Sequence, residues 1–198
     1  MQEYYDELWE GLPEDLPPPD YGLRRRFALT NVTSRERVLD LGCGTGDLAA
    51  DMARAGASVT AADVAQAALD RARRRHPELD LRLIAIDEPL PFADGEFHAV
   101  WSSEVIEHVA DTARWLSEVR RVLAPRGRVL LTTPSHGRLR LLAGGIERYS
   151  QPLGDHLHLY TARSLRELLH DFGFGEIEVR AAAGPPLARR LVLARAVR

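Results

Sequence analysis

The stretch VLDLGCGTG, residues 38–46, decides how this chain folds. Its apolar half predicts a short buried strand, and its alternating glycines predict a tight turn into a helix that starts at Asp47. Glycine allows backbone conformations that are closed to other residues and lets the backbone approach a ligand closely. Open α/β sheets bind ligands at the carboxyl ends of their strands, so loop 42–46 is a candidate binding site.

The loop differs from the fingerprint of dinucleotide-binding proteins. The sixth position of G-x-G-x-x-G falls at Asp47, whose carboxylate would repel a pyrophosphate at the start of a helix. Asp40, Asp63 and Asp87 end three consecutive predicted strands, and adjacent strands lie about 4.8 Å apart, so these acids line one rim. Asp63 is placed to accept the hydroxyls of a ribose, and Asp87 is within reach of an adenine amino group. The rim therefore predicts a phosphate-free nucleoside that carries a positive amine.

Short apolar runs alternate with amphipathic, arginine-rich segments after Arg37, which indicates repeated strand-helix units. The predicted strands are 37–41, 58–63, 81–87, 98–103, 127–133, 176–183 and 187–197, and the predicted helices are 47–55, 65–75, 112–123 and 162–172. The short turn at 184–186 requires the last two strands to pair antiparallel. The expected fold is α/β: a seven-stranded, mostly parallel sheet with an antiparallel last strand and helices on both faces.

The chain divides into unequal parts. Residues 1–31 are acidic and aromatic at first and then rich in proline, so we expect an arm or lid. Residues 32–198 are expected to form the ligand-binding domain. A long segment at about 134–160 is expected to be an insertion that helps to build a second binding pocket, because long loops tend to carry binding function.

Composition excludes several classes of function. The 198 residues include 26 basic and 29 acidic side chains, a net charge of −3, so no general attraction to nucleic acid is expected. The chain has no lysine, which rules out Schiff-base chemistry and the P-loop. With a single cysteine, Cys43, and no long apolar run, a cytoplasmic protein without a membrane span is expected, as a monomer or homodimer. The runs Arg24–Arg26 and Arg73–Arg75 are interpreted as solvated faces.

Four motifs in order carry a resemblance to a known family. VLDLGCGTG, VTAADV, DEPLPFADGEFHAVWSSEVIEHV and LAPRGRVLLTTP resemble the class I S-adenosylmethionine-dependent methyltransferases, which have a Rossmann-like fold. Within that class the chain is similar to the small-molecule group that includes methyltransferase type 11 and the ubiquinone-biosynthesis O-methyltransferases. The resemblance covers about residues 35–180. His98 departs from it, because the family usually has aspartate there, and this puts the local packing in question.

The resemblance implies a set of residues that bind S-adenosylmethionine. The glycines contact its methionine part, Asp40 helps to bind its amino group, Asp63 holds the ribose and Asp87 faces the adenine. The full set of cofactor-binding candidates is Asp40, Gly42, Gly44, Gly46, Asp63, Val64, Asp87, Glu88 and Ser103.

Histidines gather where the methyl acceptor is expected. A base matters mainly when the acceptor is a hydroxyl that must lose its proton, and histidine is suited to that near neutral pH. The catalytic candidates are His108, His156 and His158, and His136 lies in the same part of the sequence.

A divalent metal site is a second hypothesis for the acceptor side. The spacing of Glu104, Glu107 and His108 would bring their side chains together on a helical turn, and His156 could join them from the later loop. This resembles the Glu-x-x-Glu-His pattern of ubiquinone-biosynthesis O-methyltransferases and of small-RNA 2′-O-methyltransferases, which implies a metal such as Mg²⁺. The other reading is that the Glu-His pair only bonds the backbone and the cofactor.

The expected function is methyl transfer from S-adenosylmethionine to a small-molecule acceptor, with oxygen favoured over nitrogen. One alternative is a metal-dependent RNA 2′-O-methyltransferase, which the acidic balance and the lack of an appended RNA-binding module disfavour. Another is a non-catalytic subunit that binds S-adenosylmethionine and stabilises a partner.

Overall fold

A computed structural model describes residues 2–14, 19–86, 88–137, 156–185 and 188–198. The amino-terminal helices are α1 (Gln2–Gly11) and α2 (Tyr21–Asn31). The elements that follow are β1 (Arg37–Leu41), α3 (Asp47–Arg54), β2 (Ser58–Asp63), α4 (Gln66–Arg75), β3 (Asp80–Leu83), β4 (Phe97–Ser103), η1 (Ile106–His108), α5 (Thr112–Val122), β5 (Leu123–Pro134), α7 (Ala162–Asp171), β6 (Gly175–Ala182) and β7 (Leu191–Val197). No helix in this described part of the chain is both long and apolar enough to cross a membrane.

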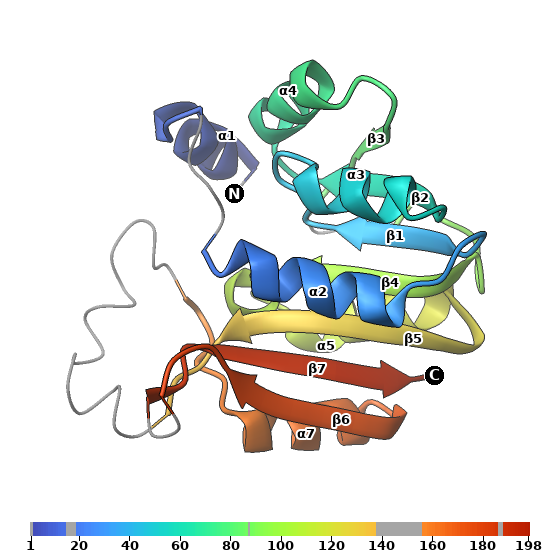
Figure 1. Cartoon of the computed structure of the whole chain (residues 1–198), viewed down its shortest axis with the longest axis vertical. Helices are drawn as coiled ribbons and strands as arrows, with labels where there is room; N and C mark the ends of the chain where they lie inside the picture. The colour runs from blue at the N-terminus through green and yellow to red at the C-terminus, as the bar shows by residue number, and fades with distance from the viewer. Residues whose placement is uncertain (1, 15–18, 87, 138–155, 186–187) are drawn as a thin grey trace.

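The strands form one seven-stranded sheet in the order β3-β2-β1-β4-β5-β7-β6 (Figure 1). Neighbours from β3 to β5 pair in parallel, and β7 is antiparallel to both β5 and β6. The α/β fold with its antiparallel last strand is therefore confirmed. Because β1 to β5 run the same way, their carboxyl ends lie along one edge, which is the edge expected to bind a ligand.

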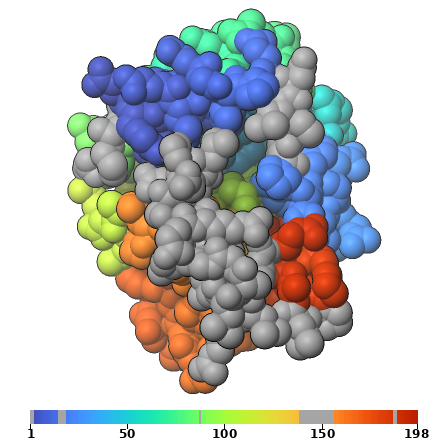
Figure 2. Space-filling view, turned by 90° about the vertical axis from the view of Figure 1, so that its left-hand side faces the viewer, coloured from blue at the N-terminus to red at the C-terminus, as the bar shows by residue number. Residues whose placement is uncertain are grey.

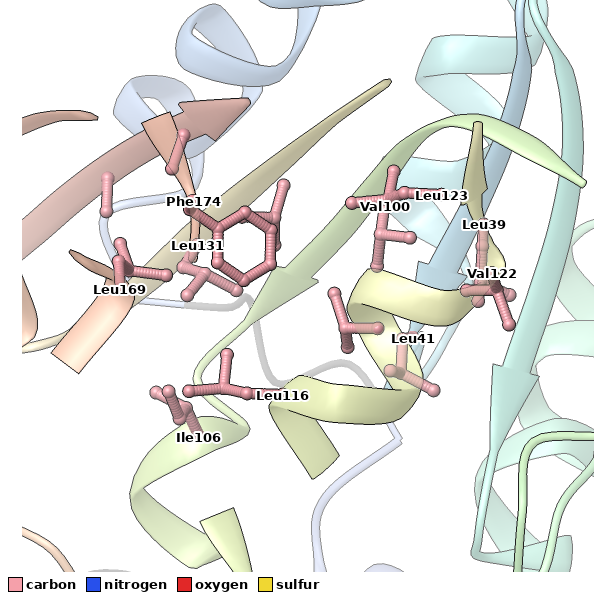
Figure 3. Packing of buried hydrophobic residues seen from close by; sticks show 14 of the residues in the cluster. Leu39, Leu41, Val100, Ile106, Leu116, Val122, Leu123, Leu131, Leu169 and Phe174 are labelled. Carbon is pink, nitrogen blue, oxygen red and sulfur yellow. The ribbon is translucent and has the colours of Figure 1, made fainter. Parts of the chain in front are cut away.

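The two faces of the sheet are covered by different helices. Successive strand residues point to opposite faces, and β1 follows this rule: Val38 belongs to a core cluster with residues of α2 and α3, whereas Leu39 belongs to one with residues of α5 and α7. Figure 3 shows the second cluster, in which Leu116 and Leu169 approach the strands from α5 and α7. Full burial of one such leucine is worth about 1.5–3 kcal/mol. The prediction of helices on both faces is confirmed.

The described part of the amino-terminal segment is mainly helical. It contains α1 and α2, separated by the proline-rich stretch. α2 covers one face of the sheet, whereas α1 packs on α4, where Asp6 Oδ1 accepts the main-chain N–H of Ala67 at 3.0 Å. That N–H is in the first turn of α4, which has no side-chain cap of its own, so the carboxylate of Asp6 satisfies one of its unpaired donors.

Two local expectations differ from the structure. The third strand ends at Leu83, not at residue 87, although the main-chain N–H of Ile84 still donates to the carbonyl of Asp63 at 3.0 Å. His98 preserves the local packing, because its Nδ1 accepts the main-chain N–H of Arg37 at 3.0 Å. This bond lies near the amino ends of β1 and β4, away from the ligand edge.

Candidate active site

A cavity of about 530 Å³ opens at the carboxyl edge of the sheet. This volume is within the usual range for small-molecule sites. Figure 2 looks onto this side of the molecule, where α1 forms the upper part of the surface. Tyr4, Tyr5, Leu8 and Trp9 of that helix line the cavity, opposite the strand ends and the glycine loop. The aromatic residues of the amino terminus therefore belong to the site.

The glycine loop takes a backbone path that requires glycine. Gly42, Gly44 and Gly46 have φ values of 81°, 53° and 75°, in the left-handed region that side chains disfavour. A Cβ on Gly42 would lie 2.3 Å from Cγ2 of Val105, and one on Gly44 would lie 3.0 Å from the Trp9 ring. Gly42 and Gly44 line the cavity, whereas Gly46 starts α3 and faces Leu79.

Asp63 connects the end of β2 to the glycine loop. Its Oδ2 accepts the main-chain N–H of Gly44 at 2.8 Å, and its Oδ1 accepts that of Ala65 at 3.0 Å. Burial raises the pKa of this carboxyl, and the N–H donors oppose that shift. A carboxylate has about four acceptor positions, so Asp63 holds the loop and keeps lone pairs for a ligand in the cavity that it lines.

Asp40 and Arg24 place an acidic and a basic side chain in the same cavity. Oδ2 of Asp40 and the Nε and Nη2 atoms of Arg24 are buried without a hydrogen-bond partner among the described residues. Arg24 is only 4% exposed, and its Nη1 donates to Oγ of Ser103 at 2.9 Å. The interpretation of this arginine as part of a solvated face is therefore wrong. Buried unpaired polar atoms are rare and need a partner, so the pair predicts a ligand with an ammonium and an anionic group.

Three of the other four cofactor candidates line the cavity, and the fourth lies outside the described residues. Val64, Glu88 and Ser103 line the cavity, and Ser103 also exchanges a 2.7 Å hydrogen bond with Thr132. Asp87 lies outside the described residues, so its expected contact with adenine stays a prediction.

Glu107, His108 and His156 form a cluster that lines the same cavity. One ligand atom from each lies within 4.8 Å of the other two, and all three residues line the cavity. Glu107 is fully buried; Thr133 Oγ1 donates to its Oε2 at 2.9 Å, and its Oε1 has no hydrogen-bond partner among the described residues. Burial, followed by the charge of Glu104, raises the pKa of Glu107 well above its ordinary value. The cluster can therefore exchange protons or hold a cation.

The remaining acceptor-side candidates do not join this cluster. Glu104 precedes η1 with φ 58°, so it is not on the same helical turn, and it accepts from Thr132 Oγ1 at 2.9 Å. His158 does not line the cavity. Its Nε2 donates to the carbonyl of Val109 at 3.0 Å, and its main-chain N–H donates to the carbonyl of Glu107 at 3.0 Å. His158 thus holds the backbone that carries Glu107 and His108. Of the expected insertion, residues 138–155 lie outside the described part.

The donor set fits a divalent metal only in part. The unpaired oxygen of Glu107 and the ring of His108 suit a cation, but one carboxylate with two imidazoles is not the oxygen-rich set that Mg²⁺ prefers. His156 is also engaged elsewhere, because its Nδ1 lies 3.1 Å from Nε2 of the buried His136. The metal hypothesis therefore stays a prediction that rests on Glu107 and His108.

This fold, with a glycine loop and acidic strand ends facing one cavity, defines the class I S-adenosylmethionine-dependent methyltransferases. A family model described as a methyltransferase domain matches residues 2–179, and the chain belongs to that family.

Two of the curated relatives match about four fifths of the chain. The demethylmenaquinone methyltransferase of Beutenbergia cavernae is 33% identical over 184 residues, 82% of this chain and 76% of that protein. The ubiquinone biosynthesis O-methyltransferase of Dinoroseobacter shibae is 32% identical over 164 residues, 78% of this chain and 66% of that protein. Other curated relatives match about half of this chain and between 21% and 44% of their own length.

A solved structure supports the fold. The phosphoethanolamine N-methyltransferase 2 of Haemonchus contortus superimposes with a TM-score of 0.76 at 19% identity, over 99% of this chain and 57% of that chain.

Proposed function

We propose that the protein transfers the methyl group of S-adenosylmethionine to a hydroxyl oxygen of a small molecule. The observation that carries this proposal is the cluster of Glu107, His108 and His156, which places one carboxyl group and two imidazole rings in the cavity that the cofactor candidates also line. The name of the Dinoroseobacter relative, a ubiquinone biosynthesis O-methyltransferase, supports oxygen. The name of the Haemonchus neighbour favours nitrogen, but its 19% identity carries the fold alone.

The cofactor side of the cavity suits each part of S-adenosylmethionine. The ammonium of its methionine part would meet the unpaired oxygen of Asp40, and the carboxylate would meet the unpaired N–H groups of Arg24. The ribose hydroxyls would bond to the remaining lone pairs of Asp63. Charge-assisted hydrogen bonds of this kind are about twice as strong as neutral ones.

S-adenosylmethionine supplies a methyl group that is already activated by its sulfonium charge. In the transfer, the hydroxyl oxygen forms a bond to the methyl carbon, the carbon–sulfur bond breaks with its electron pair left on sulfur, and the hydroxyl proton goes to His108. The reaction needs in-line geometry and a dry pocket more than it needs strong acid-base help. Trp9, Tyr5 and Leu8 on α1 are placed to exclude water from that pocket.

The identity of the methylated atom tests this proposal. We would incubate the protein with S-adenosylmethionine carrying a ¹³C-labelled methyl group and a panel of phenols, carboxylic acids, amines and thiols. Because the ¹³C shift of a methyl group depends on the atom that carries it, the product spectrum identifies that atom. Methoxyl signals are expected, and methyl on nitrogen, sulfur or carbon would contradict the assignment to oxygen.

The same assay separates the alternatives. Tight cofactor binding without turnover of any acceptor would favour the non-catalytic subunit. Binding of short RNA at physiological salt, with methyl transfer to it, would favour the RNA 2′-O-methyltransferase.

Asp63→Ala is expected to weaken the binding of S-adenosylmethionine at least tenfold. The change removes a charge-assisted acceptor, which is worth about 1.5–3 kcal/mol. Isothermal titration calorimetry measures the effect, and Asp70→Ala on the exposed face of α4 is the matched control. Unchanged affinity in Asp63→Ala would contradict the ribose-binding role.

Cofactor affinity is expected to depend on pH through Asp40. Burial and the nearby charge of Asp63 raise the pKa of Asp40 to about 8, so this carboxyl is mainly protonated at neutral pH in the free protein. A bound ammonium favours the carboxylate and lowers that pKa, so binding releases a proton. The dissociation constant should therefore fall as pH rises, by roughly tenfold from about pH 6 to about pH 7.

Calorimetry at each pH, in two buffers of different ionisation enthalpy, measures both the affinity and the released proton. Asp40→Asn cannot titrate, so its affinity should be weak and nearly constant over the same range. A wild-type dissociation constant that is flat with pH would show that Asp40 does not meet the ammonium.

A further inference from the structure

His136 is a buried residue that touches the acceptor side without facing it. It follows β5, is 2% exposed, and does not line the cavity. Its main-chain N–H donates to the carbonyl of Tyr160 at 2.9 Å. Its Nε2 lies 3.1 Å from Nδ1 of His156, and the two rings meet edge to face with centroids 5.3 Å apart. His136 therefore contacts the cavity-lining residue His156 without lining the cavity itself.

The backbone of Tyr160 determines which ring nitrogen of His136 carries hydrogen. The main-chain N–H of Tyr160 donates to Nδ1 of His136 at 2.9 Å, and an amide N–H can only donate. Nδ1 is therefore an acceptor, and the hydrogen of the neutral ring is on Nε2. The other tautomer could donate from Nδ1 to the carbonyl of Tyr160 at 3.2 Å. It would then direct an N–H against the N–H of Tyr160, which would lose its acceptor in a buried place.

The tautomer of His136 in turn determines the tautomer of His156. Because Nε2 of His136 carries hydrogen, it donates to Nδ1 of His156. A neutral His156 must then carry its own hydrogen on Nε2. A ring in that state can donate a hydrogen bond from Nε2, but it has no lone pair there to accept a proton or bind a metal.

We propose that His136 is a positioning residue that holds the neutral ring of His156 with its hydrogen on Nε2, so that this nitrogen is a hydrogen-bond donor. The proposal rests on the proposed function and concerns a ring that lies 5.1 Å from the ring of His108 between centroids. It also removes Nε2 of a neutral His156 from the metal ligands expected from the position of this residue in the sequence.

Nuclear magnetic resonance of the full chain, labelled with ¹⁵N-histidine and saturated with S-adenosylhomocysteine, tests the proposal directly. Long-range ¹H–¹⁵N spectra distinguish a protonated ring nitrogen from an unprotonated one, and His156→Gln and His136→Gln assign the two rings. We expect neutral His156 with hydrogen on Nε2 in the wild type. Hydrogen on Nδ1 of His156 would overturn the proposal, and so would a shift of its Nε2 signal to a metal-bound position when Mg²⁺ or Mn²⁺ is added.

Two substitutions separate positioning from folding. His136→Gln keeps an N–H donor and is expected to leave His156 with hydrogen on Nε2, whereas His136→Leu removes the donor and should give a mixture of the two tautomers. His98→Gln, at the opposite edge of the sheet, is the matched control. An unchanged His156 spectrum in a folded His136→Leu protein would refute the role. Calorimetry with S-adenosylhomocysteine is read separately, because loss of cofactor binding would contradict the proposed function and leave the tautomer result standing.

Discussion

Gly42→Ala is expected to abolish cofactor binding and to destabilise the protein by about 2–5 kcal/mol. The left-handed backbone conformation at this position costs a residue with a Cβ about 1–2 kcal/mol. The added methyl would also lie 2.3 Å from Cγ2 of Val105, and overpacking of this kind costs about 1–3 kcal/mol. Urea unfolding measures the loss of stability, and titration calorimetry measures the loss of affinity.

Two further variants make this result specific. Gly22→Ala adds a methyl group on α2, where nothing lies within 4 Å, and should leave stability unchanged or raise it by up to about 1 kcal/mol. Val105→Ala combined with Gly42→Ala removes the clash but not the backbone strain, so it should recover only part of the lost stability. Equal stability of Gly42→Ala and the wild type would contradict the loop geometry.

The strands that carry the cofactor side were predictable because their signal is local. In β1, one buried face is formed by Val38 and the other by Leu39, so the strand is mainly apolar, and a glycine turn follows it. The parallel order of the sheet then brings Asp40 and Asp63 to one edge, whatever the details of the loops. Hydrophobic pattern and strand direction are enough to predict this half of the site.

Arg24 could not be predicted in the same way. In the sequence it is one of three consecutive arginines, a pattern that is typical of a solvated helix face. Its burial depends on how α2 lies across the sheet, which brings its guanidinium to Ser103, 79 positions further along the chain. Arg25, the next residue, instead pairs with Asp51 on α3 at 2.7 Å. The helical rotation of about 100° per residue separates these roles.

The acceptor cluster was predictable only in part, because it also depends on contacts between residues that are far apart in the chain. The spacing of Glu104, Glu107 and His108 fits a helical turn, but η1 starts at Ile106 and leaves Glu104 outside it. His136 and His156 meet because the end of β5 and the segment before α7 run side by side: the main-chain N–H of His136 donates to the carbonyl of Tyr160, and the main-chain N–H of Tyr160 donates to the His136 ring. Such pairings over long distances in the chain leave no periodic signal in the sequence.

Arg24→Met is expected to weaken the binding of S-adenosylmethionine by roughly 100-fold, which corresponds to about 2.7 kcal/mol. In the proposed complex, Arg24 and the carboxylate of the cofactor form a buried charge pair, and removal of one partner of such a pair costs about 2–5 kcal/mol. Calorimetry measures the affinity. Arg26→Met is the matched control, since it changes an exposed arginine two residues away on the same helix.

The effect of Arg24→Met on folding separates a binding residue from a structural one. In the free protein, Nε and Nη2 of Arg24 are buried without hydrogen-bond partners among the described residues, so these two atoms add no hydrogen bond to the fold. Ser103 keeps its hydrogen bond to Thr132, and burial raises the pKa of Glu104, which favours uptake of a proton by that carboxylate once the cation is gone. The free energy of unfolding without ligand should therefore change by less than about 1 kcal/mol. A large loss of stability together with unchanged affinity would mean that the guanidinium serves the fold, because a group that is kept to bind a ligand is needed only when that ligand is present.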